Sequence, residues 1–326
     1  MDKLSRFRPL LLILACLIPW IAGGAPALAA DQLYWVEAGA IRRAAVDGQG
    51  VAQVLSANDA QAVFSMALAP GNGAMFWGAW IPEQFSGEIR RATLQGDEIV
   101  PIANPWSEGM GSLTVDSMND RIYYTDPSDC VPDCGSIWRM DQDGSNRERI
   151  LQQDTPFAIA VCASAGRVCW GDQYNLWIRC SDLDGGDIQT VVLETNVQSL
   201  AIDPTSEKLY WTDEGNQAIR RSNLDGSAIE DLVTGLDDPW GIALDSASGR
   251  MFWTDRGAGK IQSAGLDGSS PTDIVTGLDS PTGIAFLPQS GGVVPAASGW
   301  GLVVLTLLLL VTSTFLLLRP RSGRSG

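Results

Sequence analysis

The chain repeats a short aromatic motif at a nearly constant spacing, and this repetition constrains the fold more than any other feature. The aromatic anchors are Trp35, Trp77, Tyr124, Trp170, Trp211 and Trp253, and their spacings are 42, 47, 46, 41 and 42 residues. A second series agrees, because an isoleucine in each copy is followed seven residues later by a glycine, as in Ile219 and Gly226. A unit that recurs at such a period usually cannot bury its apolar face alone. The copies are therefore expected to pack against one another.

Each copy is predicted to consist of strands, because its apolar residues alternate in short runs between turn residues and never follow a long helical period. The copy around Trp211 contains a small apolar run at 200–203, the aromatic strand at 209–213 and a third strand at 219–223. Asp225-Gly226 then supplies the positive φ of a two-residue hairpin, which leads to a fourth strand. Such four-stranded repeats are typical of propeller blades. The predicted fold class is an all-β, six-bladed β-propeller.

The ends of the repeat region predict how the ring closes. The first copy begins at Asp31 with no apolar strand before Leu33, whereas a surplus strand, IAFL, stands at 284–287. The last segment is therefore expected to complete the first blade and to hide sheet edges that would otherwise be exposed. The predicted propeller domain spans residues 31–290.

The repeats resemble the class B (YWTD) repeats of the low-density lipoprotein receptor group, which form six-bladed propellers. The resemblance is strongest in LYWTD with IRRSNLDGS and in MFWTD with AGLDGSS, and it is good in IYYTD with MDQDGSN. The second copy departs most, with Gly78-Ala79 in place of Thr-Asp. The resemblance implies the fold rather than a function, because propellers include both binding modules and enzymes.

The N-terminal residues 1–30 are predicted to be a signal peptide. Lys3, Arg6 and Arg8 precede an apolar run at 10–21, and Ala27-Leu28-Ala29 offers the small residues that a signal peptidase requires. Lipidation at Cys16 is the alternative, but the residues after it continue the apolar core of the signal. The sequence therefore predicts an exported protein.

The C-terminal residues predict a membrane segment. Residues 300–318 form an uncharged run long enough to cross a bilayer, and the basic tail 319–326 that follows is expected in the cytoplasm. The stretch VPAASGWG at 294–301 resembles the bacterial IPTL-type sorting signal, through Pro295, Ser298, Trp300 and Gly301. This resemblance implies an exosortase-like processing enzyme as a partner of the linker and sorting motif at 291–299. The alternative is a plain membrane anchor, so the predicted location is either the cell envelope or, after processing, the outer membrane or cell surface.

Composition excludes several function classes. One acid and six bases lie in the terminal segments, so residues 31–299 carry 37 acids against 16 bases. Such a charge of −21 repels nucleic acid, whose binding depends on phosphate neutralisation. The chain has no histidine, which excludes catalysis by serine or cysteine with histidine. No metal site or cofactor is predicted, with a divalent cation such as calcium as the alternative.

Five cysteines remain after the signal peptide, an odd number for an oxidising compartment. Cys130 and Cys134 are predicted to close a small loop in the third copy. Cys162, Cys169 and Cys180 fall on the first three strands of the fourth copy, where two of them are expected to cross-link and one to stay free. The sequence leaves that pairing open.

A carboxylate follows two residues after the aromatic anchor in five copies: Glu37, Asp126, Asp172, Asp213 and Asp255. Because so many blades share it, we predict a structural role in hydrogen bonding or in pairing with Arg43, Arg91, Arg139 or Arg221 of the third strands. The repeated tryptophans are likewise predicted to pack between blades.

Function is expected where the copies differ, in loops that open on one face of the ring. Those loops contain Trp80, Phe85, Trp106 and Trp240, which we predict to form an aromatic, acidic rim that binds a protein or glycan. The alternative for these side chains is that they fold inward and plug the channel. Two other functional classes stay open: a cation-dependent lactonase-like hydrolase, which requires acids from several blades to converge, and a purely structural surface protein. No catalytic residue is predicted.

Overall fold

The computed structural model describes residues 30–289, apart from 61–62, 83, 85, 107–110, 128–134 and 153–154, and omits the side chains of Pro105 and Trp106. Residues Ala30–Pro288 form one compact unit. The predicted signal peptide, sorting motif, membrane helix and basic tail lie outside the described residues. Within the described part of the chain, no helix is long and apolar enough to cross a membrane.

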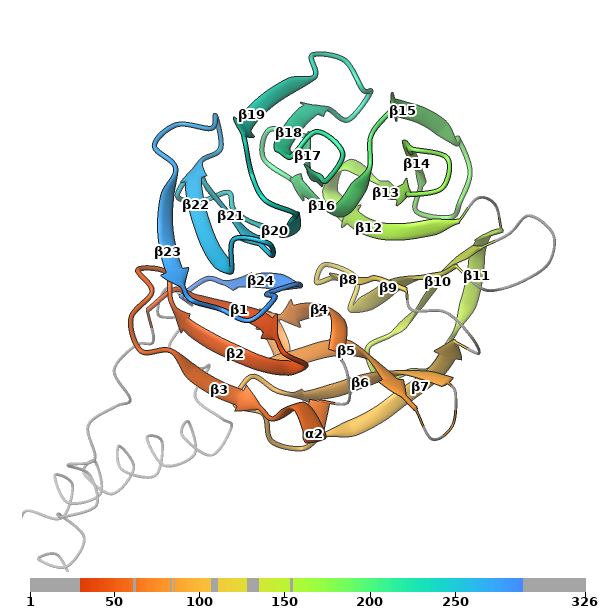
Figure 1. Cartoon of the computed structure of the whole chain (residues 1–326). Coiled ribbons are helices and arrows are strands. Elements are labelled where there is room, and N and C mark those ends of the chain that lie inside the picture. Colours follow the sequence, from red (N-terminus) through yellow and green to blue (C-terminus); the bar gives the residue numbers. More distant parts are fainter. Residues whose placement is uncertain are drawn as a thin grey trace, which may run out of the picture. The chain divides into compact units, whose positions relative to one another are not determined.

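The described residues form six four-stranded antiparallel sheets arranged as blades in a ring, which confirms the predicted propeller (Figure 1). Blade one contains β24 (Ile284–Leu287), β1 (Gln32–Glu37), β2 (Ala40–Ala45) and β3 (Ala52–Leu55). Blade two contains β4 (Val63–Ala69), β5 (Ala74–Ile81), β6 (Ser86–Thr93) and β7 (Val100–Trp106). Blade three contains β8 (Leu113–Asp116), β9 (Arg121–Asp126), β10 (Ser136–Asp141) and β11 (Glu148–Gln152).

The second half of the ring has the same order. Blade four contains β12 (Pro156–Cys162), β13 (Arg167–Asp172), β14 (Trp177–Asp182) and β15 (Gln189–Leu193). Blade five contains β16 (Val197–Asp203), β17 (Lys208–Asp213), β18 (Ala218–Asn223) and β19 (Glu230–Thr234). Blade six contains β20 (Pro239–Asp245), β21 (Arg250–Asp255), β22 (Lys260–Gly265) and β23 (Thr272–Thr276). Short helices are α2 (Ala57–Ala60), η2 (Pro70–Asn72) and η3 (Ala163–Ala165).

The ring closes within blade one, as the surplus strand predicts. β24 pairs antiparallel with β1, with Trp35 opposite Ile284 and Leu33 opposite Phe286. Val36 extends the join, because its backbone N–H donates to the Gly283 carbonyl at 2.9 Å. In Figure 1 the blue β24 lies beside the red β1, which joins the two ends of the repeat region.

The hydrophobic core consists of clusters that lie between successive blades. In blade five, Trp211 packs in the cluster with blade four, whereas its neighbour Tyr210 packs in the cluster with blade six. This division follows from the strand period of two, which points adjacent side chains to opposite faces. Each aromatic strand therefore contributes to two interfaces, and both faces of the sheet are buried.

The threonine of the YWTD motif joins blades by hydrogen bonds. The backbone N–H of Ser199 donates to Thr212 Oγ1 at 3.0 Å, and that hydroxyl donates to the Trp240 carbonyl of blade six at 2.6 Å. Thr125 and Thr254 make the same two contacts in blades three and six. These threonine hydroxyls, which lie at the seam between successive blades, therefore pair with polar backbone groups that would otherwise be buried without partners.

The glycine of each Asp-Gly-type hairpin packs against the outermost strand of the preceding blade. A Cβ at Gly48 would lie 2.1 Å from the Ile274 carbonyl oxygen of blade six, and one at Gly226 would lie 1.9 Å from that of Val191 in blade four. Both residues also have positive φ, +82° and +80°. Glycine is therefore required for close approach as well as for turning the chain.

Candidate functional site

The innermost strands of the six blades surround a channel that forms a candidate site. Its cavity is about 990 Å³. A seven-residue strand such as β16 rises about 20 Å, which sets the length of the channel. The cavity is within the size range of ligand pockets in proteins.

The channel stays open because each innermost strand presents small residues to one side. In β16, Leu200 and Ile202 pack towards blade four, whereas Ala201 packs towards blade six. The residues equivalent to Ala201 are Ala67, Thr114, Ala160, Ala243 and Ala285. Those equivalent to Ser199 are Ser65, Ser112, Ala158, Gly241 and Gly283. Side chains of this size leave space along the axis that larger ones would fill.

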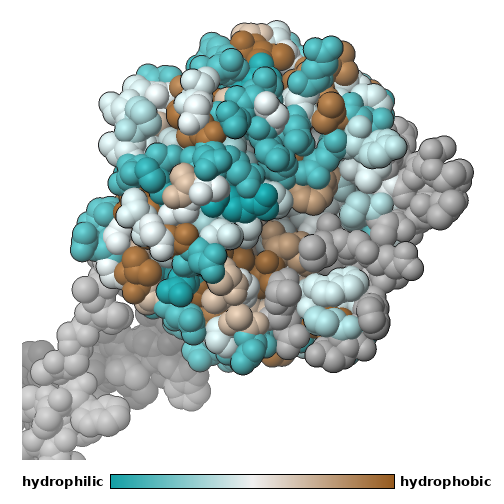
Figure 2. Space-filling model, viewed as in Figure 1, coloured by the Kyte–Doolittle hydropathy of each residue, from teal (hydrophilic) through white to brown (hydrophobic). Residues whose placement is uncertain are grey.

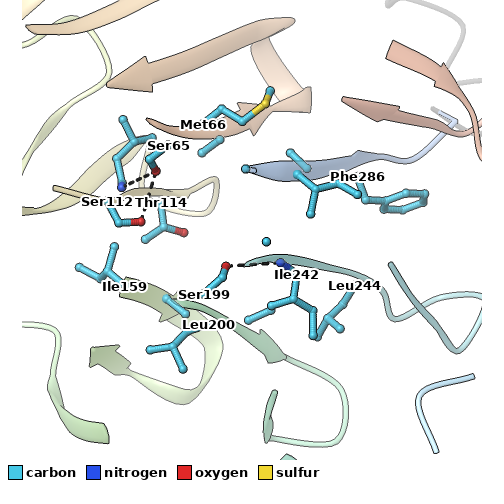
Figure 3. A pocket seen from close by; sticks show the side chains of 18 of the residues that line it. Ser65, Met66, Ser112, Thr114, Ile159, Ser199, Leu200, Ile242, Leu244 and Phe286 are labelled. Carbon is cyan, nitrogen blue, oxygen red and sulfur yellow. Dashed lines mark hydrogen bonds between the residues drawn. The ribbon is translucent and has the colours of Figure 1, made fainter. Parts of the chain in front are cut away.

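Hydroxyl groups line two sides of the channel, between apolar side chains. Figure 3 shows Ser65, Ser112 and Thr114 on one side and Ser199 on another. Ser65 Oγ accepts the Leu113 N–H at 3.0 Å and lies 3.2 Å from Ser112 Oγ. The charged lining residues in the described part of the chain are Glu214, Arg256 and Asp245. Glu214 and Arg256 follow β17 and β21, whereas Asp245 ends β20, so they lie at opposite ends of the channel.

An aromatic collar, defined as Phe64, Phe157 and Trp240, surrounds the mouth at the end where Glu214 and Arg256 lie. These residues occupy equivalent positions near the start of β4, β12 and β20, on alternate blades, and all three line the cavity. Phe157 and Trp240 meet edge to face with ring centroids 6.4 Å apart. Because blade five lies between their blades, this contact requires both rings to extend over the mouth.

Arg256 holds Trp240 in place from the turn that follows β21. The Arg256 guanidinium lies 4.0 Å from the Trp240 ring centroid, and its Nε donates to the Asp238 carboxylate. A cation at this distance attracts the ring face, and the carboxylate fixes the direction of the guanidinium. The tryptophan is therefore oriented before any partner arrives.

Blades four and five add a chain of hydrogen bonds to the mouth, between the blades that carry Phe157 and Trp240. Gln173 Nε2 donates to Gln198 Oε1 at 2.7 Å, and Gln198 Nε2 donates to Glu214 Oε2. Asn196 Nδ2 donates to the same Glu214 oxygen at 3.1 Å. The mouth therefore combines an aromatic edge with ordered amides and a carboxylate, which can recognise both apolar and polar groups.

The repeated carboxylates accept hydrogen bonds from turn residues and do not line the channel. Asp213 is fully buried and accepts hydrogen bonds from Thr195 Oγ1 at 2.7 Å and from Asn216 Nδ2 at 2.8 Å. Burial alone would raise the pKa of Asp213, but hydrogen bonds from Asn216, Thr195 and Arg220 outweigh it and lower the pKa. Asp172 receives backbone N–H groups in the same way, from Tyr174 and Asn175.

The predicted arginine pairing is wrong by one residue. Arg42 and Arg220 pair with Glu37 and Asp213, at 2.9 and 3.2 Å. Arg221 instead reaches the Leu266 carbonyl of blade six at 2.8 Å. The reason is the strand period, because Arg220 lies directly opposite Trp211 and thus shares a face with Asp213, two residues further on.

The four predicted rim residues have different positions. Trp240 lies in the collar at the channel mouth. Trp80 is partly buried near the end of β5 and does not line the cavity. Phe85 lies outside the described residues, and Trp106 is described only by its backbone at the end of β7. Sequence reasoning missed Phe157, Arg256 and Glu214, although the second residue of the innermost strands β4, β12 and β20 is aromatic in each case, on alternate blades.

The cysteines of blade four resolve the open pairing. Cys169 and Cys180 form a disulfide, and Cys162 is free and buried. Cys130 and Cys134 lie outside the described residues. Among the residues that the structure describes, no group of three or more cysteine, aspartate or glutamate side chains could hold a metal ion.

The outer surface is mainly hydrophilic on the face seen in Figure 2, where scattered brown hydrophobic atoms interrupt the teal. This pattern agrees with the excess of acids in residues 31–299, which raises solubility and attracts cationic groups. Apolar side chains exposed on this background are few. The described residues with large exposed apolar side chains are Val51, Val100, Met118, Tyr174, Leu176, Leu193 and Ile229.

Comparison with known proteins identifies the repeats and the fold. The model of the low-density lipoprotein receptor repeat class B matches residues 207–246 and 249–285. A chain in the crystal structure of a nidogen/laminin complex is 19% identical, with a TM-score of 0.68, and the match covers 80% of this chain and 100% of that chain. TolB from Acinetobacter baumannii is 12% identical, with a TM-score of 0.65, and the match covers 85% of this chain and 71% of that chain. The chain therefore contains class B repeats and has a six-bladed propeller fold that these proteins share.

Proposed function

We propose that the protein is an exported binding module that recognises a protein or glycan through the face on which the channel mouth opens. The collar and its supporting contacts carry this proposal. Trp240 contacts Arg256 and Phe157 at a concave opening. Tryptophan side chains fixed in such positions are common among the hot-spot residues of protein interfaces. The nidogen/laminin complex supports a protein partner, because a similar propeller occurs there in a protein assembly.

The polar side of the mouth would supply specificity. Glu214 and the amides of Gln173 and Gln198 form one hydrogen-bonded chain, so a partner must match their donors and acceptors to avoid leaving buried groups unpaired. The apolar side would supply binding free energy through buried aromatic area. An acidic protein that binds through such a mouth would favour neutral or basic partner groups.

Partner binding can be tested with the full-length protein, immobilised in detergent, against the envelope fraction of its native host and against a glycan array. Trp240→Ala should weaken binding of any captured partner by about 30-fold, as expected for a hot-spot aromatic. Met118→Ala is the matched control, because Met118 is an exposed apolar residue in the turn after β8, at the other end of the innermost strands. Equal loss in both variants, or in neither, would argue against the proposed face.

We further propose that the protein is exported and then either anchored or sorted by its C-terminal segment, on the basis of the motif at 294–301. Fractionation of the native host with intact mass measurement tests this. A mature form that ends within 293–298, in the outer membrane or outside the cell, supports sorting. A full-length tail in the inner membrane contradicts sorting and supports a plain anchor.

A further inference from the structure

Blade four differs from blades five and six at the corner beside the channel mouth. The corner, defined here as Tyr174, Leu176 and Leu193, comes from the turn after β13 and from the end of β15. Tyr174 is 88% exposed, Leu193 is 63% exposed and Leu176 is 43% exposed. Three apolar side chains in one place form an exposed patch, which in a soluble protein often marks an interaction site.

The equivalent positions in blades five and six are small or polar. Tyr174 replaces Gly215 and Gly257, and Leu193 replaces Thr234 and Thr276. Leu176 replaces Gln217 in blade five and Gly259 in blade six. The propeller fold therefore does not require apolar residues at these positions, and all three side chains of blade four are exposed.

The same corner contains strained backbone. Leu176 has φ of 55° and Glu194 has φ of 58°, both in the left-handed region. Blade six has Gly259 and Gly277 at these positions, with φ of 62° and 74°. A bulky side chain in this conformation costs of order 1 kcal/mol or more, and such strain concentrates at functional sites. Blade five shares the conformation at Gln217, with φ of 51°, so blade four differs in having a non-glycine residue at both positions.

Residues of β14 and β15 pack beside the corner, and the turn after β13 connects it to the channel mouth. Trp177 lies directly opposite Leu193 across β14 and β15, and Arg179 stacks on its ring at 4.3 Å from the centroid. The backbone N–H of Thr195 donates to the Leu176 carbonyl at 3.0 Å, which ties the turn to the end of β15. Gln173, next to Tyr174, belongs to the hydrogen-bonded side of the mouth. One surface thus runs from the collar to the outer edge of blade four.

We propose that this corner is a docking surface for a partner protein that presents an apolar side chain flanked by basic residues. The apolar requirement follows from the three exposed side chains. The basic requirement follows from charge, because Glu194 directly follows Leu193, Glu214 lies in the mouth on the same hydrogen-bonded chain as Gln173, and residues 31–299 carry an excess of 21 acids. The same charge disfavours a second copy of this chain. The proposal rests on the proposed function and names the chemistry of its partner.

A phage-displayed library of random dodecapeptides, selected on the full-length protein in detergent, tests the proposal. Enriched peptides should combine leucine, isoleucine or phenylalanine with lysine or arginine. A synthetic peptide of the enriched type should bind Y174G/L176G about tenfold more weakly than wild type, which is the effect of losing one anchor side chain. Met118→Ala should not change its affinity. Leu176→Gly relieves left-handed strain whereas Tyr174→Gly makes the unfolded chain more flexible, so the double variant should melt within a few degrees of wild type, which calorimetry checks before binding is compared.

The outcomes separate the corner from the mouth. One outcome is that the peptides bind Y174G/L176G as tightly as wild type but bind Trp240→Ala more weakly. This outcome contradicts the corner as a docking surface and leaves the proposed function intact. Peptides that lose affinity only in Y174G/L176G support the corner and place the partner away from the collar. The docking surface is overturned if no peptide is enriched or if acidic peptides are selected. It is also overturned if neither variant changes peptide binding, and that result overturns the proposed binding face as well.

Discussion

Cys169 and Cys180 lie directly opposite each other across β13 and β14, and their disulfide takes the place that a tyrosine and an arginine hold in blade five. There, Arg221 approaches the Tyr210 hydroxyl and also reaches the Leu266 carbonyl of blade six. The arginine thus connects two blades, whereas the disulfide connects two strands of one blade. Blade four therefore exchanges a link to its neighbour for an internal cross-link.

Removal of the disulfide should destabilise the protein by about 3 kcal/mol, because the bond closes a loop with a sequence separation of 11 and restricts the unfolded chain. Urea unfolding of Cys169→Ser/Cys180→Ser measures this. Cys162→Ala is the control, since alanine occupies the equivalent place at the end of β4 and this substitution should change stability little. If the double variant unfolds at the wild-type urea concentration, the disulfide does not restrain blade four.

Gly48→Ala should destabilise the ring by about 3 kcal/mol or more, because the new Cβ meets the Ile274 backbone of blade six as well as an unfavourable φ. Gly50→Ala separates the two causes, since Gly50 also has positive φ, +68°, but nothing lies within 4 Å of its Cβ position. It should cost only about 1 kcal/mol. Equal losses for the two variants in thermal or urea unfolding would show that the contact between blades one and six contributes nothing.

Thr254→Val should cost about 2 kcal/mol, because it leaves the Gly241 N–H and the Thr282 carbonyl without their shared hydroxyl. Valine keeps the shape of threonine, so the loss reports the hydrogen bonds and not a cavity. Thr254→Ser restores the hydroxyl and should recover most of the stability. Urea unfolding of the two variants side by side checks this, and a serine variant as unstable as the valine variant would contradict the seam role.

Gln262→Arg should stabilise the protein at neutral pH by about 1 kcal/mol. Burial raises the pKa of Asp255, although backbone N–H groups of Asp237 and Ala258 partly oppose it. Asp213, its equivalent in blade five, has Arg220 beside it, whereas blade six has Gln262 at that place. An arginine opposite Trp253 should therefore lower the pKa of Asp255 and favour its charged form.

The pH dependence gives the control for this variant. A native pKa above that of the unfolded carboxyl, about 3.9, means that the native state binds the proton more tightly. The stability contribution of Asp255 is therefore largest below pH 3.9 and falls as pH rises through the native pKa. Asp255→Asn should remove this fall, and Gln262→Arg should reduce it. Unfolding curves between pH 4 and 7 that coincide for wild type and Asp255→Asn would contradict the raised pKa.

Leu176→Gly and Glu194→Gly should each stabilise the protein by about 1 kcal/mol, because glycine accepts the left-handed backbone without strain. Gly259→Leu is the reverse change in blade six, where a Cβ would lie 2.6 Å from the Leu278 carbonyl oxygen, and it should destabilise by more. Differential scanning calorimetry measures all three. A lower melting temperature for Leu176→Gly would show that the leucine side chain contributes packing that outweighs the strain.

The architecture could be predicted from the sequence because repetition is a property of the chain itself. The nearly constant spacing of the aromatic anchors, such as Trp211 and Trp253, identifies each blade. The surplus strand at 284–287 identifies how the ring closes. The error over Arg221 was also avoidable, since the period of two already places Arg220 on the face of Asp213. These features depend on neighbours along the strand and across one hairpin.

The site was harder to predict because its residues come from different blades. Phe157 and Trp240 meet across blade five, and no local pattern reports how far two side chains reach over a channel. The corner of blade four carried a signal that was missed, since Tyr174 stands where two sister turns have glycine. Aligning the copies shows where a blade departs from the others, but exposure and strain become visible only in three dimensions.

The closure by β24 also decides when the ring can form during synthesis. The Asp279 N–H donates to Glu37 Oε1 at 3.0 Å across a separation of 242 residues. Until β24 leaves the ribosome, blade one presents an unpaired strand edge that can join another nascent chain. A slow final docking step of β24 onto β1 is the expected consequence for the folding pathway.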